Sequence, residues 1–177
     1  MSRQKRLRQH GVTLTELLVS LAVSAVLAVA AWPTIGALVA EQSASHAADR
    51  LAASLALART TASARRTEVR LEPIHGADTL DRGWQLTAPG DPPGERTPPF
   101  SVVALHDRCL RITLRATAGA VATQSLRLTP VGYSRSERGG FLAATFLVRC
   151  HQAQRQVRLG AQGRIRICRP GADADCD

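Results

Sequence analysis

The first third of the chain carries the residue spacing of a long helix, in two parts. Residues 17–40 contain no charged side chain over 24 positions. A helix of that length rises ~36 Å, which exceeds the ~30 Å hydrocarbon core of a bilayer. Beyond this run, apolar residues recur at three- and four-residue steps, at Ala44, Ala48, Leu51, Leu55, Ala58 and Ala62. We therefore expect one helix with a membrane half and an amphipathic half, and we expect it to end near Arg66, before an extended segment that leads to Pro73.

Alternation of apolar and polar residues replaces the helical spacing in the rest of the chain. It is clearest in residues 110–115, where leucine and isoleucine alternate with arginine and threonine. With the turn signals around it, this pattern predicts eight strands, at residues 67–72, 83–88, 100–105, 109–116, 125–130, 141–150, 155–160 and 163–168. Residues 87–100 hold five prolines and two glycines and predict an exposed loop, and residues 134–140 predict a second turn region. The chain is therefore expected to be an α+β protein, with the amphipathic half of the helix packed on an antiparallel domain of one or two sheets.

The net charge of +9 is concentrated in two places. Residues 1–11 carry +4 and residues 108–169 carry +11, whereas the segments between and after them are negative. Basic residues that precede a membrane helix stay in the cytoplasm, so the chain beyond the helix is expected to face the periplasm. The helical pattern runs on past the apolar segment, which argues against an ordinary secretory signal that is cleaved there.

The N-terminal stretch "HGVTLTELLVSLAVSAVLA" resembles the class III signal of type IV pilins and pseudopilins. That resemblance implies a basic leader at residues 1–11, cleavage by the prepilin peptidase between Gly11 and Val12, and methylation of the new N-terminus. Val12 departs from the phenylalanine that is usual at this position. The implied organisation is a leader at 1–11, a filament-core and membrane helix at 12–39, and a periplasmic pilin-like domain at 40–177.

Glu16 is the one acidic residue in this apolar region, and it falls fifth after the implied cleavage site. A charged side chain within a bilayer is disfavoured by roughly 2.5–3.5 kcal/mol on insertion scales, so an acid there calls for a partner. The resemblance to pilins supplies one, because the glutamate of such subunits neutralises the α-amine of a neighbouring subunit. Glu16 is therefore expected to serve filament assembly, with other pilin subunits as partners. The alternative is a plain membrane anchor with an incidental glutamate.

Three later stretches resemble the GspH/FimT branch of minor pilins, at residues 55–71, 125–150 and 157–168. Within this branch, the FimT type is associated with DNA uptake and carries a C-terminal Gly-Arg-x-Arg motif, which Gly163, Arg164, Ile165 and Arg166 match. The resemblance implies a minor pilin that binds extracellular DNA during natural transformation. GspH-type pseudopilins of type II secretion share the fold, and a purely structural role of that type is the alternative.

Strand geometry gives the motif a separate physical interpretation. On a strand, Arg164 and Arg166 would project from one face with Cα atoms ~6.5–7 Å apart, while Ile165 and Ile167 enter the core. Three further arginines are close enough in the sequence to widen the patch: Arg155, Arg158 and Arg169. Aromatic residues make up only 3% of the chain, which favours contact with the phosphate backbone, insensitive to sequence, over base stacking. The alternative is that these arginines only solvate an outer sheet face.

The four cysteines all fall in the segment expected to lie in an oxidising compartment, which predicts disulfides. Four cysteines allow three connectivities. The favoured pairs are Cys168 with Cys176, whose connecting segment contains a proline and a glycine, and Cys109 with Cys150. No pair has the spacing of a zinc site. The five histidines are scattered and no nucleophile or nucleotide-binding motif is present, so neither catalysis nor a cofactor or metal is expected.

Overall fold

The computed structural model describes residues 13–88, 98–116, 124–135, 143–160 and 162–176. The chain divides into two compact units, Met1–Gly36 and Ala37–Asp177. One helix, α1 (Leu14–Arg65), contributes to both and ends where the sequence predicted. In the described part of the chain, no single helix is long and apolar enough to cross a membrane. The stretches Leu14–Val29 and Thr34–Arg65 together have the length and composition for it.

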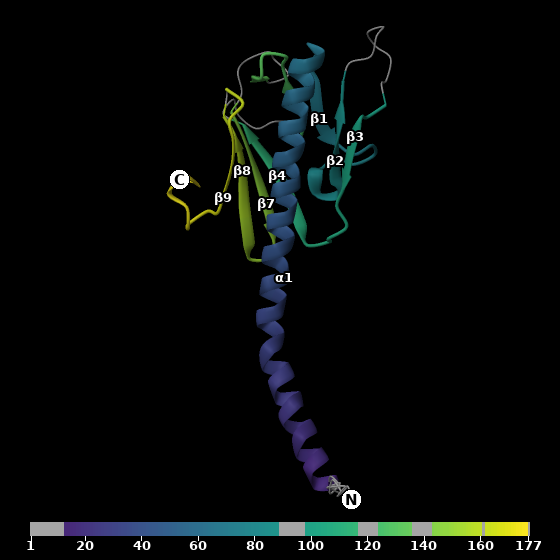
Figure 1. The fold of residues 1–177 in the computed structure, drawn as a ribbon, viewed down its shortest axis with the longest axis vertical. Coiled ribbons are helices and arrows are strands. Elements are labelled where there is room, and N and C mark those ends of the chain that lie inside the picture. Colours follow the sequence, from purple (N-terminus) through teal and green to yellow (C-terminus); the bar gives the residue numbers. More distant parts are fainter. Residues whose placement is uncertain (1–12, 89–97, 117–123, 136–142, 161, 177) are drawn as a thin grey trace, which may run out of the picture. The chain divides into compact units, whose positions relative to one another are not determined.

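The described residues of the second unit form nine strands in two antiparallel sheets, which Figure 1 shows behind α1. The five-stranded sheet has the order β3-β2-β1-β5-β6, and the four-stranded sheet has the order β4-β7-β8-β9. The strands are β1 (Val69–Pro73), β2 (Gly83–Thr87), β3 (Ser101–Ala104), β4 (Leu110–Ala116), β5 (Leu126–Leu128), β6 (Ser134–Arg135), β7 (Ala144–Cys150), β8 (Ala153–Leu159) and β9 (Ile165–Cys168). Two short 3-10 helices, η1 (Leu80–Arg82) and η2 (Ala174–Cys176), precede β2 and follow β9.

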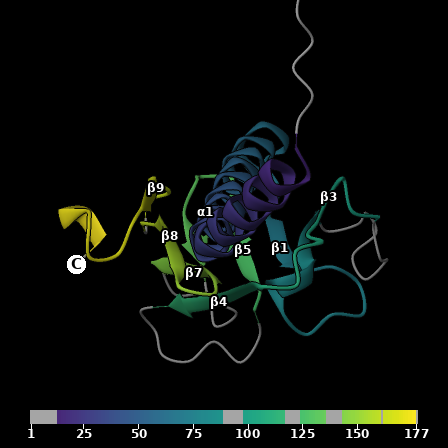
Figure 2. The ribbon, with the colours of Figure 1, turned by 90° about the horizontal axis from the view of Figure 1, so that it is seen from below.

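The amphipathic half of α1 lies against one side of both sheets (Figure 2). All six residues of the predicted stripe, from Ala44 to Ala62, have no exposed surface. They share one apolar cluster with residues of both sheets, among them Leu71, Trp84 and Phe146. The small side chains on the helix allow its backbone to come close to the strands, and burial of this apolar surface stabilises the unit by roughly 25 cal/mol per Å².

A chain of hydrogen bonds that starts at the buried Trp84 fixes the helix on the five-stranded sheet. The Trp84 indole Nε1–H donates to Ser54 Oγ at 2.9 Å, and the Ser54 hydroxyl donates to the Arg50 carbonyl at 2.9 Å. The Arg50 guanidinium donates in turn to the Ala104 carbonyl, at the end of β3, at 3.2 Å. Because the indole N–H of a buried tryptophan needs an acceptor, Ser54 fixes both the depth and the register of the helix.

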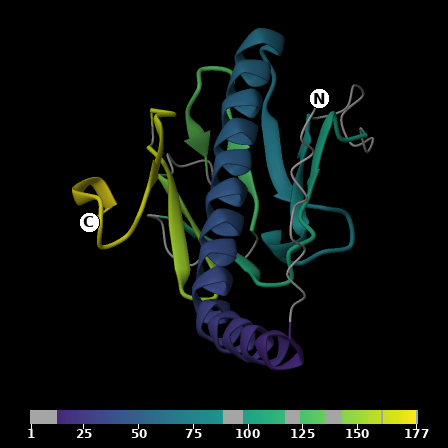
Figure 3. The same cartoon turned by 60° about the horizontal axis from the view of Figure 1, so that its bottom comes forward.

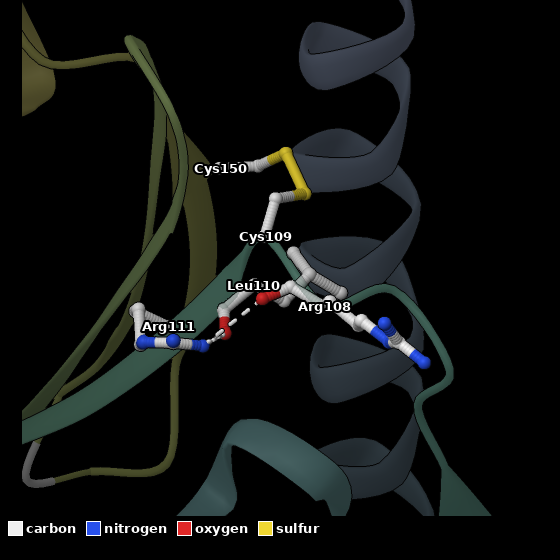
Figure 4. Close-up of a disulfide and its surroundings, with 5 residues drawn as sticks. All are labelled: Arg108, Cys109, Leu110, Arg111 and Cys150. Carbon is white, nitrogen blue, oxygen red and sulfur yellow. Dashed lines mark hydrogen bonds between the residues drawn. A yellow bond between two sulfur atoms is a disulfide. The ribbon is translucent and has the colours of Figure 1, made fainter.

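Two disulfides involve the four-stranded sheet, and they join the pairs that the sequence favours. Cys109 is bonded to Cys150, which links the residue before β4 to the end of β7 (Figure 4). Cys168 is bonded to Cys176, which links the end of β9 to η2 at a sequence separation of eight residues. The segment that carries η2 extends away from the sheet at the β9 edge (Figure 3).

The expected turn region at 134–140 is wrong at its first two residues. Ser134 and Arg135 form β6, which pairs with β5. A two-residue strand carries too little alternation to be seen in a sequence, and here it is specified by its partner strand. Residues 136–140 lie outside the described part of the chain, as do residues 89–97 of the expected loop.

Candidate nucleic-acid interface

The motif arginines lie at the β9 edge of the four-stranded sheet. Arg164 is exposed and directly precedes β9, and Arg166 is half-buried within it. The register of β8 and β9 places Arg166 directly opposite Arg158. Residues directly opposite on neighbouring strands share a face with Cβ atoms about 5 Å apart. The structure thus brings Arg158, Arg164 and Arg166 together, as the sequence suggested.

The glycine of the motif has a positional role. Gly163 is buried, has a φ of +78°, and ends the β8–β9 turn by donating its N–H to the Gly160 carbonyl at 2.8 Å. A Cβ at this position would lie 2.3 Å from the Gly132 carbonyl oxygen. The Gly163 carbonyl accepts a hydrogen bond of 3.0 Å from the Arg59 guanidinium on α1. Only glycine fits here. Its position between the helix and the β5–β6 turn fixes where β9 begins.

The sequence predicts that Ile165 and Ile167 both enter the core, and this is wrong for Ile167. Ile165 packs against the core, but Ile167 remains 41% exposed. Alternation does place it on the helix-facing side of β9, opposite Val157. β9 is the edge strand of its sheet, so on one side no neighbouring strand helps to cover that position.

Two of the five predicted patch arginines face away from the motif. Arg155 lies on the helix-facing side of β8 and forms an ion pair and hydrogen bond with Glu41 of α1. Arg169, just beyond β9, has its Nη2 3.6 Å from the same Glu41 carboxylate. Arg155 is three residues from Arg158, and an odd step along a strand reverses the face. Arg155 therefore does not widen the patch. Arg169 is partly neutralised by its ion pair with Glu41.

The opposite, outer face of the four-stranded sheet is strongly basic. Five arginines lie on it, one or two from each strand: Arg111, Arg115, Arg149, Arg158 and Arg166. None of the described residues of these four strands is acidic. At one corner, Arg111 has its Nε 3.8 Å from Asp81, and its guanidinium donates to the carbonyls of Arg108 and Leu110 (Figure 4).

Sequence reasoning did not assign Arg115 and Arg149 to the interface. Both are exposed. The register connects Arg115 with the motif through Thr145 and Arg158, whereas Arg149 lies farther along the same face, opposite Arg111 and Gln154. The alternation of residues 110–115 did show that Arg115 lies on the polar face of its strand. What the sequence lacked was the pairing order β4-β7-β8-β9, which places that face beside β9.

The predicted processing residues lie at the other end of the chain. Gly11 and Val12 are outside the described residues. Glu16 is exposed and lies in the first turn of α1, where its N–H donates to Thr13 Oγ1 at 3.3 Å. A carboxylate in this position interacts favourably with the positive end of the helix dipole, so Glu16 fits the helix start apart from any role in assembly.

One group of possible metal ligands occurs in the described part of the chain, at Cys109, Cys150 and His151. Its two sulfur atoms form a disulfide. A metal ligand needs the thiolate, which a disulfide does not offer. This group therefore gives no support for a metal site.

Comparisons with known proteins bear on the fold and the family. The family model described as type II transport protein GspH matches residues 47–172. The chain belongs to this GspH family. The model of the prokaryotic N-terminal methylation motif matches residues 6–32, across the predicted cleavage site. A search of curated protein sequences finds no match.

Solved structures with this fold include the type IV minor pilin FimU of Pseudomonas aeruginosa strain PAO1. One crystal structure of FimU has 20% identity and a TM-score of 0.52, and the alignment covers 72% of this chain and 87% of FimU. A second crystal form has 18% identity and a TM-score of 0.50, with coverages of 70% and 91%. At these identities the likeness establishes the pilin-like α+β fold alone.

Family membership and the methylation motif define the general class of this GspH-family protein. It is a minor type IV pilin or pseudopilin, a structural filament component and not an enzyme. The motif implies processing by the prepilin peptidase and association with other pilin subunits, and with the helix it fits a subunit anchored in the inner membrane.

Proposed function

We propose that this GspH-family protein is a minor type IV pilin of the FimT type that binds extracellular DNA for uptake in natural transformation. The observation that carries the proposal is the position of Arg164 and Arg166 at the β9 edge, continuous with a basic outer face whose described strand residues include no acid. Guanidinium groups bind phosphate oxygens through two parallel hydrogen bonds, which suits them to a nucleic-acid backbone.

The interface favours binding that is insensitive to base sequence. The described outer-face positions of the four strands hold arginine, threonine, glutamine, leucine and cysteine but no aromatic residue on which a base would stack. No helix or two-stranded ribbon projects from this face in the described residues to enter a major groove. Phosphate contacts position a nucleic acid without reading its sequence.

The N-terminal part of the proposal follows the pilin pattern. The prepilin peptidase cuts between Gly11 and Val12, and Val12 becomes the methylated N-terminus. The helix at 12–39 then anchors the subunit in the inner membrane and enters the filament core, with residues 40–177 in the periplasm. Glu16 pairs with the α-amine of a neighbouring subunit, which offsets the cost of a charge in an apolar environment.

A paired substitution tests the DNA-binding role. Arg164→Gln with Arg166→Gln removes two positive charges and keeps polar side chains. In the mature chain, purified in non-ionic detergent, the slope of log affinity against log salt should become shallower by ~1.8, since each phosphate contact contributes ~0.9. The matched control is Arg70→Gln with Arg135→Gln, two exposed strand arginines of the five-stranded sheet. An equal loss in the control would mean that net charge alone attracts DNA.

The second candidate is a purely structural pseudopilin of the GspH type, which serves type II secretion. Two observations favour it: the description of the matching family, and the use of Arg155 and Arg169 in ion pairs with Glu41. In this account the arginines stabilise and solvate the domain. Absence of DNA binding by the wild-type mature chain at low salt would select this candidate.

A further inference from the structure

The outer face of the four-stranded sheet is hollowed on the side away from α1. A pocket of about 490 Å³ lies there, lined by β7 and β8 and by the end of β4. Arginine side chains border it, at Arg115, Arg149 and Arg158, and Thr145, Gln154 and Gln156 add hydroxyl and amide groups. None of the lining residues is acidic. Leu147, 6% exposed, is an apolar lining residue.

We infer that this pocket is a second phosphate-binding surface, across which a nucleic-acid strand continues from the β9 edge. The inference rests on the proposed function and extends it to Arg115 and Arg149, two residues outside the Gly-Arg-x-Arg motif. Within the described residues neither forms an ion pair, whereas Arg111 lies near Asp81, and Arg155 and Arg169 lie near Glu41. Arg115 and Arg149 are thus available to an anion from solution.

The register makes the surface continuous. Arg115, Thr145, Arg158 and Arg166 form one row across β4, β7, β8 and β9. Three inter-strand steps of ~4.8 Å give this row a length of ~14 Å. A DNA strand carries one phosphate per ~3.4 Å of helix axis, so the row matches about four nucleotides. Arg149 lies four residues along β7 from Thr145, ~13 Å from the row, and widens the basic surface toward the β7–β8 turn.

The chemistry of the pocket selects a phosphodiester chain. Its guanidinium groups bind the anionic oxygens, while the amides of Gln154 and Gln156 and the hydroxyl of Thr145 donate to sugar or phosphate oxygens. A small free anion would engage one or two arginines and leave the rest of the row unused. A polyanion engages the whole row, and the counterions that it releases on binding add to the affinity.

Four forms of the mature chain in non-ionic detergent test the inference against short duplex and single-stranded DNA. They are the wild type, Arg115→Gln with Arg149→Gln, Arg164→Gln with Arg166→Gln, and the control Arg70→Gln with Arg135→Gln. The control pair matches the pocket pair in residue type, exposure and charge change, but it lies on a face that also carries Glu72. With duplex DNA, the pocket pair should make the salt slope shallower by ~1.8, so that raising salt from ~50 to ~200 mM weakens binding about twelvefold less than in the wild type.

The outcomes separate the inference from the proposed function. If the motif pair loses binding while the pocket pair matches the wild type, the pocket inference is wrong and the proposed function stands. If the wild type binds no DNA at low salt, both are wrong. If the pocket and control substitutions reduce DNA affinity equally, the effect is one of overall charge and the pocket has no role.

A measurement on the wild type alone makes the test independent of variant folding. Phenylglyoxal modifies exposed guanidinium groups, and the modified positions can be read by peptide mass spectrometry. Bound DNA should slow modification of Arg115 and Arg149 and leave Arg70 unchanged. Equal modification of Arg115 and Arg149 with and without DNA would overturn the inference.

Discussion

Gly163→Ala should destabilise the second compact unit, Ala37–Asp177, through backbone geometry and without removing a charge. The residue has a φ of +78°, and a Cβ there would lie 2.3 Å from the Gly132 carbonyl oxygen and 3.1 Å from Arg59 Nε. The end of the Arg59 side chain can move, but the Gly132 carbonyl belongs to the backbone of the β5–β6 turn. The turn must therefore shift, and the hydrogen bond from Arg59 to the Gly163 carbonyl is strained.

The loss in free energy of unfolding that Gly163→Ala should cause has two parts. A left-handed conformation costs a non-glycine residue roughly 1–2 kcal/mol. Forcing an extra carbon into a closed contact typically costs another ~1–3 kcal/mol. Gly76 isolates the first part, because it has a φ of +82° and a Cβ there would have nothing within 4 Å. Gly76→Ala also has the same effect on the entropy of the unfolded chain, so the difference between the two variants reports the contact, ~1–3 kcal/mol.

Urea unfolding of the disulfide-bonded mature chain, followed by tryptophan fluorescence, measures this difference. With an m-value of about 2 kcal/mol/M, a difference of ~2 kcal/mol lowers the midpoint for Gly163→Ala by about 1 M relative to Gly76→Ala. Equal midpoints for the two variants would refute the close contact of Gly163 with Gly132 and Arg59. The glycine of the motif would then have to be explained in another way.

Three further predictions concern the core and the N-terminus. Ser54→Ala leaves the buried Trp84 indole N–H without its acceptor, and it should reduce the free energy of unfolding by ~1–3 kcal/mol in the same urea assay. Intact-mass analysis of membrane material should give a mature chain that starts at methylated Val12, and a chain that keeps Met1 would contradict the processing. Glu16→Val should leave membrane insertion intact or improve it and should lower incorporation into filaments. Equal amounts of variant and wild type in sheared filaments would exclude the pairing role.

The periodic parts of the fold could be predicted from the sequence. The apolar stripe of α1 follows from residue spacing, and the positions of the eight expected strands follow from spacing together with turn signals, because burial imposes a period on every residue of a regular element. β6 could not be found in this way, since Ser134 and Arg135 are specified by pairing with β5. The division into two sheets depends on long-range pairing, which local spacing does not encode.

The candidate site was predictable in its motif and less so in its surroundings. Arg164 and Arg166 could be placed by resemblance. Strand alternation alone predicts that Arg155 is not part of the patch, because it lies an odd number of residues from Arg158 and therefore on the opposite face. By contrast, the alignment of Arg115 with Arg166 needed three strand registers, and the ion pairs of Glu41 needed the position of α1 against β8.

The central claim is that the basic face at β9 binds the backbone of DNA. The most direct test is equilibrium binding of the wild-type mature chain, in non-ionic detergent, to two DNA molecules of unrelated sequence over a range of salt. Five arginine contacts, at Arg115, Arg149, Arg158, Arg164 and Arg166, predict equal affinity for both sequences and a log–log salt slope of roughly −4.5 with duplex DNA. No binding at low salt, or an affinity that differs strongly between the two sequences, would contradict the account.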